Sequence, residues 1–475
     1  MSPLAARGRS GVLLLAVLSL LAFGSPDGPA TARPSAGLAG TRPNIVLILT
    51  DDQGIDSFPR TPPVMPWLQG RVQDPADRWV SFPNAFENTP VCCPSRATIL
   101  SGQWSHHTGV LNNGTGELFD ESSTIATWLQ AAGYRTGLYG RYLNDYPWDR
   151  GPYVPPGWDE WHALMSGENS DTNYYGYTMN ENGTPVAYGT AAEDYLTDVV
   201  RDKAVAFIEG TAPEEPFFLH VTFTAPHRPW TPAPRHAQAY KTLEFPKRPN
   251  FNEADRSDKP AWVQALAGVS ALKMDNFLRG HARTLLAVDE AVHAMLDALA
   301  ARGVLDDTVV IVLTDNGFSF GEHRLVGKGC VYEECIRTPL VIRNSAAAKR
   351  TVTNLVGNVD LAATIAGLAG VTPGRPQDGA SLVPLLEGER PTWRTAYLLR
   401  SDQWREVTGY WGLRTALWSY AELFSGEIEL YDLTADPYQL QNLCPPPSFG
   451  CGSYEAKRSR LHRMLQALKN APPGG

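Results

Sequence analysis

Two continuous apolar segments constrain the fold of this chain more than any other feature of its sequence. Residues 44–50 read NIVLILT and residues 308–314 read TVVIVLT, and neither run contains a charged side chain. Runs of this kind are typical of strands that are buried on both faces, as in a parallel sheet. A chain built on such strands needs helices to cover both faces of the sheet.

The rest of the first 385 residues alternates between helical and strand-like patterns. Helical patterns are present at residues 123–132, 191–209 and about 276–301. Further strand-like segments follow at residues 216–224 and 339–343. Strands that alternate with helices predict an α/β fold, with a mainly parallel sheet sandwiched by helices.

The pattern changes after about residue 385. Residues 395–432 contain short, aromatic, alternating segments that predict antiparallel hairpins, and residues 453–469 have a helical pattern. We therefore predict a catalytic α/β domain over residues 33–385 and a small C-terminal antiparallel α+β subdomain over residues 386–475.

The N-terminus has the pattern of a secretory signal peptide. Arg7 and Arg9 precede an apolar run at residues 12–23, and Ala30-Thr31-Ala32 follows as a cleavage site of the A-x-A type. The alternative is a membrane anchor, but a spanning helix needs about 20 apolar residues. We expect residues 1–32 to be a signal peptide, and the mature protein to be secreted, extracellular and without a membrane span.

The charge balance excludes one class of partner. Lys and Arg number 41 against 50 Asp and Glu, which gives a formal net charge of −9. Nucleic-acid-binding proteins present a basic surface, so we expect no nucleic-acid partner. Any site for an anion on this chain must be locally basic.

The six cysteines fit an oxidising compartment. Two pairs are close enough in sequence for local disulfides: Cys330 with Cys335, and Cys444 with Cys451. The adjacent Cys92 and Cys93 would be strained as a disulfide and require another explanation.

Polar residues follow each of the two apolar strands directly. Asp51 and Asp52 follow the first strand, and Asp315 and Asn316 follow the second. Ligands of open α/β sheets bind beyond the carboxyl ends of the strands. Three carboxylates and an amide oxygen at one sheet edge favour Ca²⁺ or Mg²⁺ over zinc. The alternative is that these side chains cap the turns after the strands.

The segment 92–102 reads CCPSRATILSG. Pro94 suits the first turn of a helix, so Cys92 is expected at a helix N-terminus, where anions are favoured. A thiolate beside a group of carboxylates would nevertheless be a poor arrangement.

This segment resembles the sulfatase signature C-x-P-S-R-x-x-x-x-T-G, with Ser101 in place of the usual Thr. The similarity covers most of the chain, through ILTDDQG, TDNGFSFGEH, KGCVYEECIRTPL and LYDLTADPYQLQNL. Four further segments resemble more narrowly the glucosamine-6-sulfatase branch, which includes extracellular heparan-sulfate sulfatases: GRYLNDY, YVPPGWDEW, DYLTDVVRDKA and APHRPW. The resemblance implies an alkaline-phosphatase-like architecture.

The resemblance also implies a modified nucleophile and a metal ion. A formylglycine-generating enzyme oxidises the signature cysteine of the family, here Cys92, to formylglycine (3-oxoalanine). The hydrated gem-diol offers one hydroxyl to attack sulfur and a second to expel sulfate. A calcium ion is expected on five residues: Asp51, Asp52, Cys92, Asp315 and Asn316.

Three basic residues match further positions of the family, and a fourth departs from its pattern. Arg96 matches the arginine that holds the formylglycine, and Lys328 matches the lysine that contacts the sulfate ester. His227 matches the histidine that binds the sulfate and assists the leaving group, a role that suits an unperturbed pKa of about 6.5. Arg141 stands where the branch has a lysine. It keeps the positive charge but carries it on a planar guanidinium group, so its role stays open.

Substrate recognition has no comparable motif. The aromatic stretch 153–188 is either a surface for a sugar ring or an ordinary packed loop. His106 and His107 follow the nucleophile segment and either border the pocket or lie on the surface.

The resemblance therefore implies an exported sulfatase that hydrolyses sulfate monoesters, with O-sulfate on a sugar such as N-acetylglucosamine-6-sulfate as substrate. Three alternatives stay open: an aryl sulfatase of broad specificity, a phosphonate monoester or phosphodiester hydrolase with the same nucleophile, and a catalytically inactive protein that binds sulfated glycans. An inactive protein should lack part of the site, whereas here every core member of the site is present except the lysine that Arg141 replaces.

Overall fold

The computed structural model describes residues 42–474, except residues 60, 167–172, 245–246 and 447–449. The expected signal peptide, residues 1–32, lies outside the described residues. The boundary at residue 385 between the two predicted domains stays a prediction.

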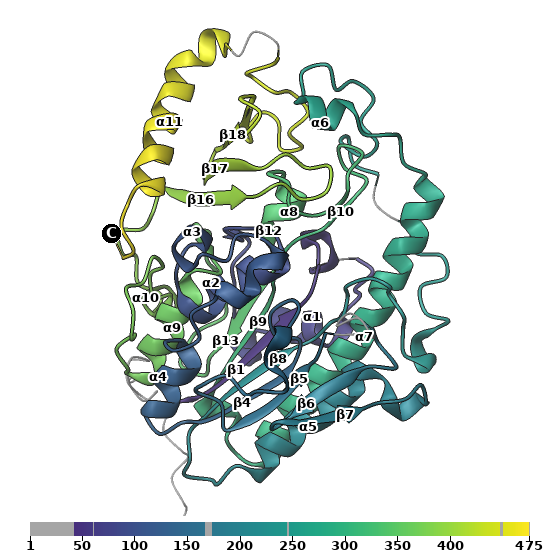
Figure 1. Ribbon diagram of the computed structural model, residues 1–475, viewed down its shortest axis with the longest axis vertical. Coiled ribbons are helices and arrows are strands. Elements are labelled where there is room, and N and C mark those ends of the chain that lie inside the picture. The colour runs from purple at the N-terminus through teal and green to yellow at the C-terminus, as the bar shows by residue number, and fades with distance from the viewer. Residues whose placement is uncertain (1–41, 60, 167–172, 245–246, 447–449, 475) are drawn as a thin grey trace, which may run out of the picture. The chain divides into compact units, whose positions relative to one another are not determined.

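The two apolar segments form neighbouring central strands of a ten-stranded sheet (Figure 1). Strand β1 (Asn44–Thr50) pairs in parallel with β9 (Thr308–Thr314) on one side and with β8 (Phe217–Thr222) on the other. The sheet continues in parallel through β4 (Arg135–Gly140) to β5 (Glu160–Leu164). The predicted mainly parallel sheet is confirmed.

The margins of this sheet are mixed or antiparallel. On one side, β13 (Leu340–Arg343) runs antiparallel to β9, and β2 (Trp79–Ser81) and β14 (Arg350–Thr351) follow it. On the other side, β6 (Thr178–Glu181) and β7 (Thr184–Ala187) form an antiparallel hairpin. The sequence patterns predicted a strand at residues 339–343 but not this hairpin.

Helices cover both faces of the sheet, and strand β1 shows why. Ile45, Leu47 and Leu49 pack into one hydrophobic core, whereas Val46 and Ile48 pack into a second core on the opposite face. The first core lies under α2 (Cys92–Ser101), α4 (Ile125–Ala131), α9 (Asp360–Ala369) and α10 (Val383–Glu387), and the second under α1 (Pro66–Gln73), α5 (Leu196–Gly210) and α7 (Ala271–Ala301).

Local capping explains where two helices differ from the prediction. Helix α7 starts at residue 271 rather than near 276 because the Ser270 hydroxyl accepts a hydrogen bond from the Lys273 amide at 3.3 Å. Helix α5 starts at residue 196 because Tyr195 has an extended backbone (φ −61°, ψ 116°) after a short 3₁₀ turn at Ala192–Asp194.

The C-terminal part contains a separate four-stranded antiparallel sheet, as predicted. Its strands are β16 (Ala396–Ser401), β17 (Tyr410–Thr415), β18 (Trp418–Leu423) and β19 (Ile428–Asp432). Helix α11 (Glu455–Lys469) packs on this sheet through Leu461 and Leu465. Both predicted disulfides, Cys330–Cys335 and Cys444–Cys451, are present.

Short elements complete the described chain. They are β3 (Ala85–Phe86), β10 (Ser319–Phe320), β11 (Val326–Gly327), β12 (Arg337–Thr338), β15 (Val356–Gly357), α3 (Ser105–Thr108), α6 (Ala261–Gln264) and α8 (Glu333–Ile336). Within the described residues, no helix has both the length and the apolar character needed to cross a membrane.

Candidate active site

The acidic residues after β1 and β9 meet at one edge of the sheet, as expected. The two strands pair in register up to Thr50 opposite Thr314. The Asp52 amide donates to Asp315 Oδ1 at 3.2 Å, and Asn316 Nδ2 donates to Asp52 Oδ1 at 2.6 Å.

A left-handed residue allows two consecutive carboxylates to face the same site. In an extended strand, successive side chains point to opposite faces. Asp52 has φ +64°, which ends the extended conformation directly after Asp51. Oxygen atoms of the two carboxylates therefore lie within 4.8 Å of each other despite being adjacent in sequence.

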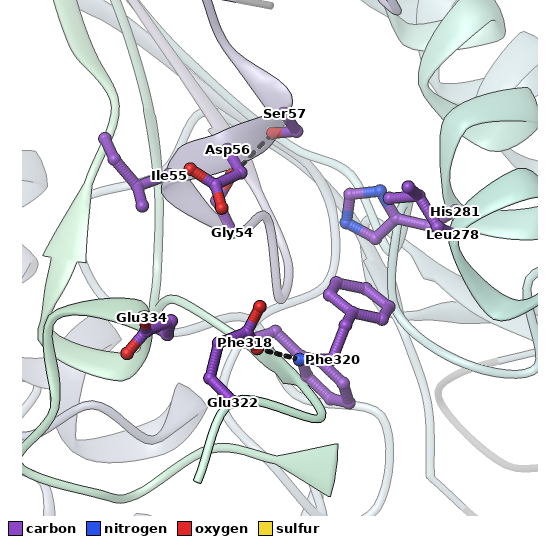
Figure 2. Close-up of a pocket in the computed structure, with 10 residues that line it drawn as sticks. All are labelled: Gly54, Ile55, Asp56, Ser57, Leu278, His281, Phe318, Phe320, Glu322 and Glu334. Atoms are coloured by element: carbon purple, nitrogen blue, oxygen red, sulfur yellow. Dashed lines mark hydrogen bonds between the residues drawn. The ribbon is translucent and has the colours of Figure 1, made fainter. Parts of the chain in front are cut away.

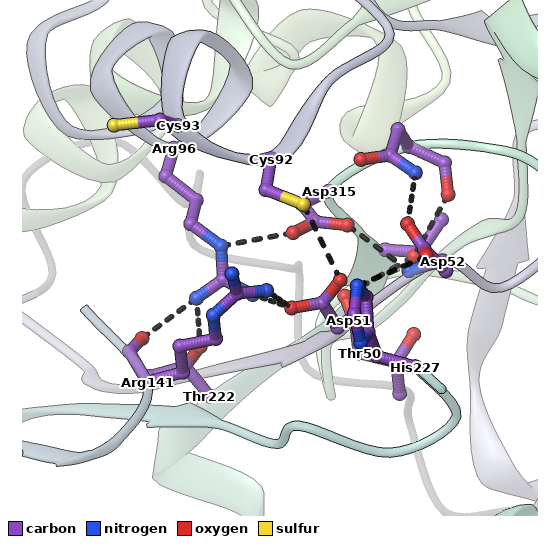
Figure 3. A network of polar contacts seen from close by, with 12 residues as sticks. Thr50, Asp51, Asp52, Cys92, Cys93, Arg96, Arg141, Thr222, His227 and Asp315 are labelled. Atoms are coloured by element: carbon purple, nitrogen blue, oxygen red, sulfur yellow. Dashed lines mark hydrogen bonds and ion pairs between the residues drawn. The ribbon is translucent and has the colours of Figure 1, made fainter. Parts of the chain in front are cut away.

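Helix α2 brings Arg96 onto the sheet edge (Figure 3). Its Nε donates to Asp315 Oδ2 at 2.9 Å, and its Nη2 donates to Asp51 Oδ2 at 3.0 Å. The third nitrogen, Nη1, donates to Thr222 Oγ1 of β8 at 2.7 Å. One buried guanidinium thus fixes the N-terminal half of α2 against three strands of the sheet.

Cys92 is the first residue of α2 and is fully buried. Its Sγ lies 3.5 Å from Asp51 Oδ1 and accepts a hydrogen bond from Lys328 Nζ at 2.6 Å. Burial, and then the charge of Asp51, raises the pKa of the Cys92 thiol. The thiol stays protonated at neutral pH, which agrees with the sequence argument against a thiolate nucleophile.

Two further cations neutralise the carboxylates. Lys328 Nζ donates to Asp52 Oδ1, and Arg141 Nη1 donates to Asp51 Oδ2. Burial alone would lower the pKa of Lys328, but the charges of Asp52 and Asp51 outweigh it and raise that pKa. Burial likewise raises the pKa of Asp51, but Arg141 and the other cations outweigh it and lower that pKa. Both residues remain charged.

The donor atoms at this edge fit a hard divalent cation. Ligand atoms of Asp51, Asp52, Cys92 and His227 lie within 4.8 Å of one another. Asn316 Oδ1 is buried and has no hydrogen-bond partner among the described residues. Carboxylate and amide oxygens are the donors that Ca²⁺ and Mg²⁺ prefer.

Asp315 is held differently from the other expected ligands. It is not in the 4.8 Å group, and its two oxygens accept from Arg96 Nε and the Asp52 amide. Burial, and then the neighbouring charge of Asp51, raises the pKa of Asp315 to about 6. This excess of negative charge is what a bound cation would relieve.

His227 follows β8 and reaches the same carboxylates. Its Nε2 lies 3.5 Å from Asp52 Oδ2, and its Nδ1 donates to the Arg228 carbonyl at 2.6 Å, which orients the ring. The side chain is 21% exposed, against 4% for Asp52. Burial lowers the pKa of His227, and the charges of Asp52 and Asp51 oppose that shift.

A cavity of about 470 Å³ opens onto this cluster. It is lined by Asp52, Asn173, His227, Arg228, Pro229, Phe318, Gly327, Lys328, Trp404 and Arg405. Asn173 lies in the stretch 153–188, which the sequence left open as a surface for a sugar ring, whereas Trp404 and Arg405 were missed by the sequence argument. Trp404 and Arg405 lie between β16 and β17 in a segment interpreted only as hairpins, and no motif marks them.

Two groups were left open by the sequence, and the described residues of both lie largely away from this cavity. Neither His106 nor His107 lines it. Within the described part of residues 153–188, only Asn173 lines the cavity, while Trp161, Tyr174 and Tyr177 are at most 2% exposed and pack in the interior. His107 Nδ1 pairs with Asp378 Oδ2 at 2.7 Å and does not line the cavity.

A second, much smaller cavity of about 10 Å³ holds two buried carboxylates (Figure 2). Glu322 and Glu334 line it, and one oxygen of each has no hydrogen-bond partner among the described residues. Burial, and then the neighbouring charge of Glu334, raises the pKa of Glu322 from 4.5 to about 8.

We expect Glu322 to make stability depend on pH. The folded protein holds the Glu322 proton more tightly than the unfolded chain does, because the pKa of this carboxyl is raised on folding. Its contribution to the free energy of unfolding is therefore complete below about pH 4.5 and is lost as the pH rises to about 8. The measurement is the free energy of unfolding, taken from urea titrations at several pH values in this window. The unaltered protein should lose up to about 1.4 kcal/mol more per pH unit than Glu322→Gln does. Identical pH slopes for the two proteins would contradict the assignment.

A mainly parallel sheet with carboxylates and buried cations at its strand ends suits an enzyme that hydrolyses anionic esters. A model of the family described as Sulfatase matches residues 43–371, and one described as N-sulphoglucosamine sulphohydrolase, C-terminal, matches residues 321–471. The chain belongs to the sulfatase family, a class of sulfuric ester hydrolases.

Two relatives of the chain are themselves named as sulfatases. The chain is 34% identical to human N-acetylglucosamine-6-sulfatase, over 85% of this chain and 82% of that protein. It is 32% identical to the extracellular sulfatase SULF-1 homolog of Drosophila melanogaster, over 79% of this chain but only 34% of that protein. It therefore spans about a third of the length of the Drosophila relative.

A solved structure has the same fold over nearly its whole length. That protein is in complex with its substrate D-glucosamine-2-N,6-O-disulfate. The TM-score is 0.77 at 28% sequence identity, over 91% of this chain and 99% of that chain. The similarity agrees with the alkaline-phosphatase-like sulfatase architecture that the sequence implied.

Proposed function

We propose that this protein hydrolyses the O-sulfate ester of a sugar such as N-acetylglucosamine-6-sulfate. The observation that carries the proposal is the 470 Å³ cavity, on which Lys328, Asp52 and His227 converge. The human relative is named for this substrate, and the solved neighbour is described with a 6-O-sulfated glucosamine as its substrate.

The nucleophile is proposed to be formylglycine made from Cys92 by a formylglycine-generating enzyme of the host. The raised pKa of the encoded thiol supports this step, because a protonated thiol is a poor nucleophile. Once hydrated, formylglycine supplies a hydroxyl nucleophile and a second hydroxyl for sulfate release.

Calcium is proposed as the metal. Asp51, Asp52, Asp315 and Asn316 would hold it together with residue 92, and the unpartnered Asn316 Oδ1 supports this donor set. The ion would supply positive charge next to the sulfate ester.

The protein's own side chains then have distinct tasks. Arg96 fixes the start of α2, so that residue 92 stays at the sheet edge. Lys328 Nζ, next to residue 92, neutralises charge that develops on the sulfuryl oxygens, and such a donor typically contributes about 10²–10³ in rate. The Nδ1–H of His227 is held by the Arg228 carbonyl, so the ring must gain a second proton on Nε2 before it can donate that proton to the departing alcohol. Arg141 keeps Asp51 ionised.

Removal of the divalent ion should abolish most of the activity without unfolding the protein. Dialysis against a strong chelator is expected to lower kcat by about 10² or more, since the ion contributes several kcal/mol of charge stabilisation. Addition of Ca²⁺ should restore the rate, and a circular dichroism spectrum controls for folding. Full turnover in excess chelator would remove the metal from the mechanism.

Export is proposed as well. The signal-peptide pattern of residues 1–32 and the extracellular sulfatase among the relatives support it. Recovery of the protein from the medium, with an N-terminus after residue 32, is the expected result.

The substrate class is tested with protein purified from its own host. Sulfate release is measured from N-acetylglucosamine-6-sulfate and from an aryl sulfate, and alcohol release is measured from a phosphodiester. The highest kcat/KM is expected for the sugar sulfate. Turnover of the aryl sulfate alone would replace the sugar by a broad aryl specificity, and turnover of the phosphodiester alone would overturn sulfate hydrolysis.

A further inference from the structure

Two arginines line the same cavity as Lys328 and His227 and, within the described residues, form no ion pair with a carboxylate. Arg228 is half-buried and Arg405 is exposed. Among the residues that the structure describes, neither guanidinium has a hydrogen-bond or ion-pair partner. The nearby Lys328, in contrast, is bound to Asp52.

The Arg228 guanidinium is held in place by aromatic rings. Its Cζ lies 5.5 Å from the centre of the Trp230 ring and 5.6 Å from that of Phe318. Cation–π contacts at this distance fix a cation without neutralising it. Burial lowers the pKa of Arg228. The charges of Asp52 and Glu406 oppose that shift, and the charge of Arg405 adds to it.

Arg405 stands on a closed turn that packs against the Lys328 loop. The amide and carbonyl of Trp404 bond with those of Val407 at 3.0 and 2.9 Å, so Arg405 is presented by a four-residue turn. Trp404 in turn packs on Gly329, where a Cβ would lie 2.9 Å from Trp404 Cβ and φ is +87°. Only glycine fits there, and it sets Trp404 beside Lys328.

Two cations that face one cavity repel each other, and an anion bound between them would offset that repulsion. Guanidinium groups bind sulfate and carboxylate through paired N–H donors. The cavity volume of about 470 Å³ lies within the range of small-ligand sites. The sulfate ester that reacts belongs at Lys328, which contacts residue 92. Among the described residues, neither arginine forms a hydrogen bond or ion pair with residue 92, Asp51 or Asp52, so both are free to bind a different anionic group.

We propose that Arg228 and Arg405 bind a second anionic group of the substrate, so that the preferred sugar carries another negative substituent besides the ester that is cleaved. This inference rests on the proposed function. The group is a sulfate or carboxylate, either on the same sugar or on its neighbour.

The test compares kcat/KM for three substrates: N-acetylglucosamine-6-sulfate, N-sulfoglucosamine-6-sulfate, and N-acetylglucosamine-6-sulfate linked to a uronic acid. At least one doubly anionic substrate should be preferred by about tenfold to a hundredfold, the range of a charged hydrogen bond. The preferred substrate identifies whether the N-sulfate or the carboxylate is bound.

Variants of the two arginines identify the site. Arg228→Gln and Arg405→Gln should each reduce the preference ratio by about tenfold, and Arg405→Lys should retain part of it. The matched control is Arg463→Gln, an exposed arginine of α11 that does not line the cavity.

Three outcomes overturn the inference. Equal kcat/KM for all three substrates in the unaltered protein overturns the inference but leaves the proposed function in place. An unchanged preference ratio in both arginine variants excludes these residues as the site. Release of sulfate from none of the sugars overturns the proposed function and the inference together.

Discussion

Replacement of Cys92 by Ala is expected to lower kcat for sulfate release by about 10⁵, the scale on which loss of a nucleophile acts. Residue 92 is fully buried at the first position of α2, and its sulfur contacts Lys328 and Asp51. Ala cannot be converted to formylglycine. Lys328 and Arg96 keep their carboxylate partners without the sulfur, so the surrounding charges remain paired.

The measurement is sulfate release by the two proteins at equal concentration, with thermal unfolding as the check on folding. The melting temperature should change by only a few degrees, because one small side chain is shortened. Turnover within tenfold of the unaltered protein would show that residue 92 is not the nucleophile.

The adjacent Cys93 provides a matched control. It is equally buried, and burial raises the pKa of its thiol to about 12, so the two cysteines share an environment that suppresses the thiolate. Cys93 packs against Gly116, where an added Cβ would lie 2.9 Å from its sulfur. Cys93→Ala should cost about 1 kcal/mol of stability and retain turnover.

The sequence was sufficient to predict the centre of the sheet and the acidic edge of the site. The segments at residues 44–50 and 308–314 are apolar on both faces, and parallel neighbours end at the same edge. That geometry alone brings Asp51 and Asp315 together. The two disulfides were predictable because each links residues only 5 or 7 positions apart.

The rest depended on contacts between distant segments. The Asp315 carboxylate turns toward Arg96, 219 residues earlier in the chain, and no local pattern indicates that pairing. Trp404 and Arg405 reach the cavity because the C-terminal sheet packs beside the Lys328 loop. Local periodicity describes which residues are buried, but it does not describe which loops meet.

His227→Ala is expected to affect substrates in proportion to how poor their leaving groups are. A positioned acid contributes about 10²–10⁴ when the departing oxygen needs a proton. The alcohol of a sugar sulfate is such a leaving group, whereas the nitrophenolate of a nitrophenyl sulfate leaves readily without one. The variant should therefore lose about 10³ in kcat on the sugar sulfate and less than about tenfold on the nitrophenyl ester.

The comparison of two substrates separates proton donation from damage to the acidic edge. His227 Nε2 lies 3.5 Å from Asp52 Oδ2, so its removal also alters the surroundings of that carboxylate. Damage of that kind would slow both esters equally, because both depend on the same nucleophile and cations. His462→Ala is the control, since that side chain is 44% exposed on α11 and does not line the cavity. Equal losses on both esters would assign His227 to the support of Asp52, and only an unequal loss identifies it as the acid.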